Sequence, residues 1–149
     1  MPNLQFNSLT KVCFLGLIGC SIMLSFSACS PKINFLTSSV VPAARGTVTV
    51  KTDDNKNHKI SIEIINLAEP ERLQPPKKMY MVWMTTDQDI TKNLGQIKTS
   101  SGKLSSTLKA SFETVTTFKP VKIFITAEED SNVQSPGWEI VLSTDKFSN

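Results

Sequence analysis

Residues 46–65 read Gly-Thr-Val-Thr-Val-Lys-Thr-Asp-Asp-Asn-Lys-Asn-His-Lys-Ile-Ser-Ile-Glu-Ile-Ile, and this stretch decides the fold class. Two apolar runs within it alternate with polar residues, and their apolar members are Val48, Val50, Ile60, Ile62 and Ile64. A period of two is typical of β-strands that bury one face. Because polar residues 53–57 separate the runs, the pattern predicts two antiparallel strands joined by a five-residue turn.

Apolar segments farther along the chain extend this pattern. Residues 80–86 are apolar on both faces and are expected to form a central strand. Residues 68–78 contain three prolines, which lack the amide donor of a central strand, so we expect a long connection between sheets there. Further strands are predicted at residues 93–99, 111–117, 121–128 and 138–144. About seven short strands and no convincing helix predict an all-β fold, an antiparallel, immunoglobulin-like β-sandwich.

The N-terminal residues have the order of a secretory signal peptide. Lys11 supplies a positive charge, residues 12–26 are mostly apolar, and the small residues Ser27 and Ala28 directly precede Cys29. The apolar run is shorter than the roughly 20 residues that span a bilayer. Ser27-Ala28-Cys29 resembles a lipobox, although Phe stands two residues before Ala28 where Leu is usual. We predict cleavage between Ala28 and Cys29 and a lipid on Cys29; an ordinary secreted protein cut nearby is the alternative.

The cysteine count supports lipidation. Cys13 and Cys20 lie inside the predicted signal peptide, residues 1–28, so Cys29 is the single cysteine of the predicted mature chain and no intrachain disulfide is expected. Each buried CH₂ of an acyl chain contributes about 0.8 kcal/mol, and two chains make a stable anchor. The predicted location is the cell envelope, outside the cytoplasm, on the cytoplasmic or the outer membrane. Ser30, a non-acidic residue after the cysteine, favours the outer membrane in two-membrane bacteria.

The predicted mature chain has 149 − 28 = 121 residues, which suits one domain. We expect residues 29–45 to be the lipidated N-terminus and a tether, and residues 46–149 to be the sandwich. As a flexible chain the tether would span on the order of 20 Å. Its apolar residues could place part of it on the domain or the membrane surface; they are Ile33, Phe35, Leu36, Val40 and Val41. The mature charge of 15 − 13 = +2 is small and dispersed, so we expect no nucleic-acid partner.

Acidic clusters and a histidine are the candidates for chemistry, and the sequence favours ordinary structural roles for them. Asp87-Gln88-Asp89 and Glu128-Glu129-Asp130 bring acidic side chains together, but no calcium-binding loop surrounds them, so we interpret both as solvated turns. His58 is the sole histidine, which leaves a zinc site or a catalytic triad without partners. We therefore predict no catalytic residue, no metal site and no cofactor, and expect the protein not to be an enzyme.

Methionine and tryptophan side chains on the predicted central strand suggest packing. Met79, Met81 and Trp83 should share one face, whereas Met84 should lie on the other, so three methionines cannot converge on a soft metal from this strand alone. Trp83 and Trp138 are interpreted as core or sheet-covering residues. An exposed pair of tryptophans would instead favour stacking against sugar rings.

The order of short motifs along the chain resembles the C-terminal, extracytoplasmic domain of the anti-sigma-K factor family. The resemblance covers residues 46–143. It rests on Tyr80-Met81-Val82-Trp83-Met84, Leu94-Gly95-Gln96-Ile97, Ile125-Thr126-Ala127-Glu128, Pro136-Gly137 and Val141-Leu142. Family members join this domain through a membrane helix to a cytoplasmic sigma-binding segment, and we expect neither part from this sequence.

The resemblance implies a regulatory setting, in which a membrane-spanning regulatory protein would be the partner. Together with the predicted lipid on Cys29, it leads us to expect a membrane-anchored envelope lipoprotein with a non-catalytic interaction or sensing module. The alternative is a carbohydrate- or cell-wall-binding lipoprotein that uses an exposed aromatic side chain. Exposure of Trp83 and Trp138 separates the two hypotheses.

Overall fold

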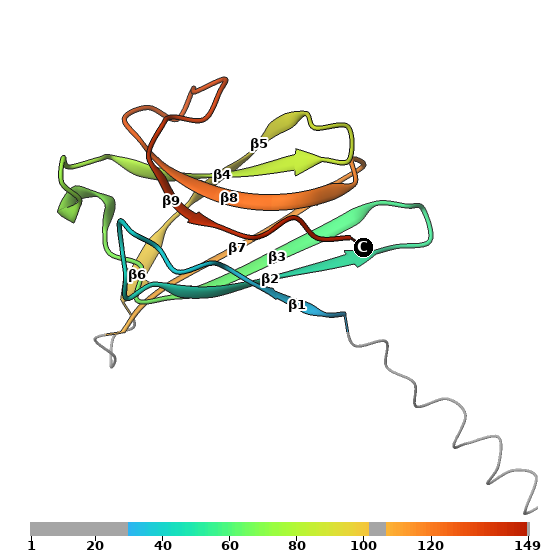
Figure 1. Cartoon of the computed structure of the whole chain (residues 1–149), viewed down its shortest axis with the longest axis horizontal. Helices are drawn as coiled ribbons and strands as arrows, with labels where there is room; N and C mark the ends of the chain where they lie inside the picture. The colour runs from blue at the N-terminus through green and yellow to red at the C-terminus, as the bar shows by residue number, and fades with distance from the viewer. Residues whose placement is uncertain (1–29, 102–106, 149) are drawn as a thin grey trace, which may run out of the picture.

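The computed structural model describes residues 30–101 and 107–148. The predicted signal peptide and Cys29 lie outside these residues, as does the predicted turn at Gly102. The described chain forms two stacked antiparallel sheets (Figure 1). These sheets confirm the predicted all-β sandwich. Within the described residues, no helix has the length and apolar composition needed to cross a membrane.

The larger sheet has five strands and the smaller sheet has four. In spatial order, the first consists of β1 (Lys32–Asn34), β2 (Arg45–Thr52), β3 (His58–Ile65), β7 (Leu108–Thr116) and β6 (Thr99–Ser101). The second consists of β5 (Thr91–Ile97), β4 (Met79–Thr86), β8 (Pro120–Glu128) and β9 (Ile140–Ser143). The strands beyond the seven that we predicted are β1 and β6, which have three residues each.

The β2–β3 hairpin has the predicted five-residue turn, because Thr52 pairs with His58. Val48 lies opposite Ile62 and Val50 opposite Ile60, so both rows of side chains face the same layer. The Asp53 carboxylate holds the turn, because it accepts hydrogen bonds from the amides of Asn55 (2.9 Å) and Asn57 (2.8 Å). Hydrogen bonds from the side chain and the backbone of Asn57 stabilise the ionised carboxylate and lower the pKa of Asp53.

The hydrophobic core lies between the sheets. Tyr80, Val82 and Met84 of β4 are buried in it, and so are the inward isoleucines of β3. Residues 66–78 connect the two sheets, as predicted, and include a short 3-10 helix, η2 (Pro70–Arg72). The Tyr80 hydroxyl donates a hydrogen bond to the Ala68 carbonyl (2.9 Å), which fastens this connection to the core. Burial raises the pKa of Tyr80 well above its usual range.

The segment that we predicted as a tether is mostly part of the sandwich, which corrects the boundary at residue 46. Its strand β1 pairs with β2, and Phe35, Val41 and Ala44 are buried in the core. The Phe35 amide donates to the Gly46 carbonyl (3.0 Å), and the next amide, of Leu36, donates to Ser143 of β9 (2.8 Å). The chain thus crosses from the edge of one sheet to the edge of the other, and this pairing leaves little free tether.

The two ends of the sandwich carry different connections. One end, which we call the entry end, carries the turns at residues 53–57, 87–90 and 117–119. The chain enters from this side, because β1 begins at Lys32, opposite Thr49 in the second half of β2, and runs away from the entry end (Figure 1). The connections 66–78 and 129–139 lie at the opposite end, which we call the far end.

Candidate functional site

The connection between β8 and β9 presents the most exposed large apolar side chain in the described residues. Trp138 is 81% exposed, and Ile140, two residues later, is also exposed. Glu139 between them is buried, and its Oε2 atom has no hydrogen-bond partner in the described part of the chain. Alternation along this edge therefore directs Trp138 and Ile140 outward and Glu139 inward. Figure 1 shows the connection at the far end, beyond the smaller sheet.

A buried carboxylate fixes the backbone immediately before Trp138. Glu128 at the end of β8 accepts hydrogen bonds from the Gly137 amide (2.7 Å) and from the Thr126 hydroxyl (2.5 Å). Thr126 in turn accepts a hydrogen bond from Trp83 Nε1 (2.8 Å). A Cβ atom at position 137 would lie 2.8 Å from Glu128 Oε2, so a larger residue there would displace the carboxylate from its hydrogen bonds. The backbone at Gly137, directly before Trp138, is therefore held in place by its hydrogen bond to the underlying sheet.

Glu128 corrects our interpretation of residues 128–130 as a solvated turn. Two donors compensate its burial, and neither is apparent from the acidic run Glu-Glu-Asp. Asp130 does behave as a turn residue, because its carboxylate accepts a hydrogen bond from the Asn132 amide (3.0 Å).

A second apolar cluster lies on the outer face of the smaller sheet. Met81, Trp83 and Phe124 are buried there, and Met79 and Val133 pack against them. The Trp83 and Phe124 rings stack with their centroids 6.4 Å apart. Since Val133 belongs to the β8–β9 connection, that connection covers the face. Met84 lies in the other cluster, between the sheets, as the predicted alternation requires. Trp83 is thus a packing residue, and an exposed pair of tryptophans is absent from the described structure.

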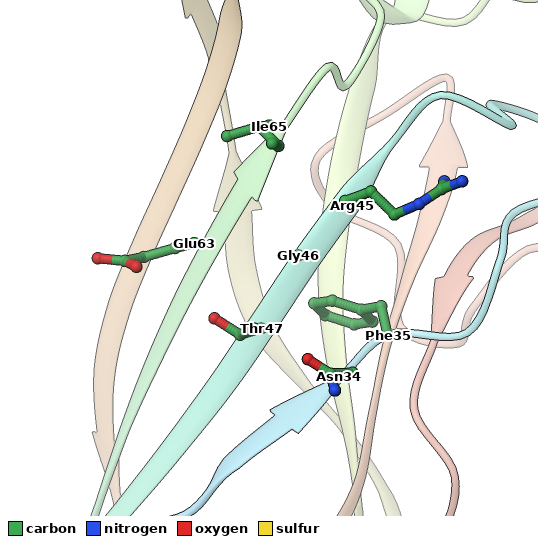
Figure 2. A pocket seen from close by; sticks show the side chains of 7 residues that line it. All are labelled: Asn34, Phe35, Arg45, Gly46, Thr47, Glu63 and Ile65. Carbon is green, nitrogen blue, oxygen red and sulfur yellow. The ribbon is translucent and has the colours of Figure 1, made fainter.

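A depression on the larger sheet is a weaker candidate. Its volume is about 320 Å³, and Figure 2 shows its lining: Asn34, Phe35, Arg45, Gly46, Thr47, Glu63 and Ile65. Arg45 Nη1 already donates to the backbone carbonyls of Pro42 (2.6 Å) and Ala44 (2.7 Å). Arg45 thus holds the 42–45 turn, so we assign the depression a structural role.

The other residues considered from the sequence lie apart from Trp138. His58 begins β3, is buried, and has Nδ1 3.0 Å from the Thr52 hydroxyl. Asp89, in the 87–90 turn, forms an ion pair with Lys146 near the C-terminus (2.9 Å). Across residues 30–101 and 107–148, no three His, Cys, Asp or Glu side chains converge as metal ligands would.

Comparisons of the chain with family models, curated proteins and solved structures found no match. The resemblance to the anti-sigma-K factor family therefore stays a prediction. Four residues that carry it are joined in one hydrogen-bond network next to Trp138: Trp83, Thr126, Glu128 and Gly137. Their role in this protein is structural, so these motif positions do not identify a ligand.

Proposed function

We propose that the protein is a lipid-anchored envelope protein whose β-sandwich is a non-catalytic binding module, with Trp138 at the centre of its binding surface. The exposed indole on a fixed backbone is the observation that carries this proposal. Exposing a large aromatic ring to water is unfavourable, and tryptophan is enriched among the residues that contribute most to protein interfaces. The lipobox-like Ser27-Ala28-Cys29 supports the anchor.

The partner in this proposal is a membrane-spanning regulatory protein, which the family resemblance supports. Trp138 and Ile140 supply an apolar centre, and the mostly polar residues 129–136 precede it in the same connection. Because Gly137 is hydrogen-bonded to a buried carboxylate, little ordering of this backbone would accompany binding.

Carbohydrate binding is the second candidate, and the exposure of Trp138 is the observation that favours it. A flat aromatic face can stack on a sugar ring. Because Trp83 is buried, Trp138 is the one tryptophan of the two that could stack on a sugar.

We expect Trp138→Ala to abolish partner capture without changing the thermal stability of the sandwich. Truncating a central tryptophan costs about 2 kcal/mol or more of binding free energy, roughly a 30-fold loss of affinity. The measurement is a pull-down from detergent-solubilised envelope with the full-length protein as bait. The control is Val115→Ala, which removes an exposed apolar side chain from β7 in the larger sheet.

A membrane-spanning protein that is captured by wild type and Val115→Ala, and lost with Trp138→Ala, would support the regulatory proposal. Co-sedimentation of the wild type with purified cell-wall sacculi, again lost with Trp138→Ala, would support the carbohydrate candidate instead. If both assays gave the same result for wild type and Trp138→Ala, Trp138 would not be the binding surface.

A further inference from the structure

The predicted lipid and the folded sandwich are separated by very little chain. Only Ser30 and Pro31 stand between Cys29 and the first strand, which begins at Lys32. An extended chain covers at most roughly 3.6 Å per residue, so the Cα atom of Lys32 lies within about 11 Å of that of Cys29. From Lys32 onward, pairing with β2 and burial of Phe35 fix the chain to the sandwich.

This short link limits which part of the sandwich can approach the membrane. Lys32 pairs with Thr49 near the middle of β2, and the chain before Lys32 leads toward the entry end, where the turns 87–90 and 117–119 also lie. These two turns touch, because the Asp87 amide donates a hydrogen bond to the Lys119 carbonyl (3.1 Å). A lipid on Cys29 would therefore bring both turns close to the bilayer surface.

The two turns carry a pair of exposed apolar side chains with lysines beside them. Ile90 is 47% exposed and Phe118 is 45% exposed. The Lys92 ammonium lies over the Phe118 ring, 4.0 Å from its centroid, and Lys119 follows Phe118 in the chain. Exposed apolar side chains with adjacent cations are suited to the interface between anionic headgroups and acyl chains.

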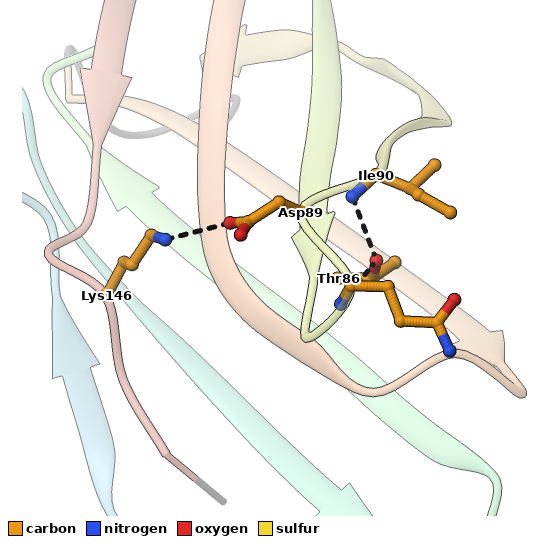
Figure 3. A network of polar contacts seen from close by, with 5 residues as sticks. Thr86, Asp89, Ile90 and Lys146 are labelled. Carbon is orange, nitrogen blue, oxygen red and sulfur yellow. Dashed lines mark hydrogen bonds and ion pairs between the residues drawn. The ribbon is translucent and has the colours of Figure 1, made fainter.

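The entry end also contains aspartates, and several of them have partners. Figure 3 shows Asp89 paired with Lys146 and the Ile90 amide bonded to the Thr86 hydroxyl (3.2 Å). Asp53 is engaged by its own turn. Asp54, Asp87 and Asp145 also lie near this end, so we expect apolar contact to contribute more than net charge.

We propose that the entry end of the sandwich rests on the bilayer that holds the lipid, with Phe118 and Ile90 in the interface. This orientation rests on the proposed lipid anchor. The far end then faces away from that membrane. Since β8 has nine residues at about 3.3 Å each, Trp138 is held on the order of 30 Å from the bilayer surface.

The test uses tryptophan fluorescence of the full-length lipidated protein in vesicles of phosphatidylethanolamine and phosphatidylglycerol. Trp138→Phe provides the background, in which Trp83 is buried. Into it we place Phe118→Trp at the entry end or, as the matched control, Ile65→Trp at the far end; both native side chains are 45% exposed. Each protein is compared in vesicles with and without brominated acyl chains.

We expect brominated lipid to reduce the emission of Phe118→Trp and to leave that of Ile65→Trp unchanged. The lipid on each variant is first confirmed by mass spectrometry. Equal quenching of both lipidated variants would then overturn the orientation and leave the anchor intact. If mass spectrometry found no lipid on the protein, both the proposed anchor and the proposed orientation would be overturned.

Discussion

Val82→Asp is expected to abolish cooperative folding of the sandwich. Val82 is fully buried at the middle of β4, between β5 and β8, and faces the core that β3 contributes to. An aspartate there would have to bury an unpaired carboxylate or take up a proton, and either costs several kcal/mol. That cost is comparable with the whole stability of a small domain, which is about 5–15 kcal/mol.

Thermal unfolding followed by circular dichroism measures this effect. Val115→Asp is the matched control, because it makes the same chemical change on β7 at a side chain that is 62% exposed. The control should retain a cooperative transition. If Val82→Asp unfolded cooperatively within a few degrees of the wild type, Val82 would not face the core.

Phe35→Ala is expected to lower the free energy of unfolding by about 3 kcal/mol. Phe35 is buried between the sheets, and its ring packs so closely on β2 that a Cβ at Gly46 would lie 3.1 Å from Phe35 Cδ2. Truncation would leave a cavity where the chain crosses between the sheets. For a domain of this size, the loss corresponds to a fall in Tm of roughly 10 °C.

Leu36→Ala is the control for Phe35→Ala, since Leu36 is 49% exposed and its backbone bond to Ser143 does not need the side chain. Denaturant unfolding of both variants compares the two positions. Similar small losses for both would mean that residues 30–45 are a tether after all, and that the core begins at β2.

Local patterns were sufficient to predict the hairpin and the central strand. Alternation through Val48, Val50 and Ile60 determines which face of each strand is apolar, and the polar residues 53–57 determine the register. The apolar residues on both faces of β4 predicted its central position. Its outer face is covered by the β8–β9 connection, through Val133.

The N-terminal segment and the site could not be predicted from local patterns. The buried residues Phe35, Val41 and Ala44 follow no strand or helix period, and Phe35 pairs with Thr144, which is more than a hundred residues away. The same holds for Glu128, whose acidic neighbours suggested a solvated turn while its partner Gly137 lies nine residues later. Our interpretation of Trp138 as a core or sheet-covering residue was wrong, because Trp138 is 81% exposed and the next residue, Glu139, is the one that is buried.

The lipid on Cys29 is the claim on which the envelope location and the orientation both depend. Cells that express the wild type or Cys29→Ser can be labelled with a radioactive fatty acid, and the protein then immunoprecipitated and compared at equal amounts. We expect label on the wild type and none on Cys29→Ser, which should accumulate as uncleaved precursor or as a soluble form. Equal label on the two proteins, or none on the wild type, would contradict the account.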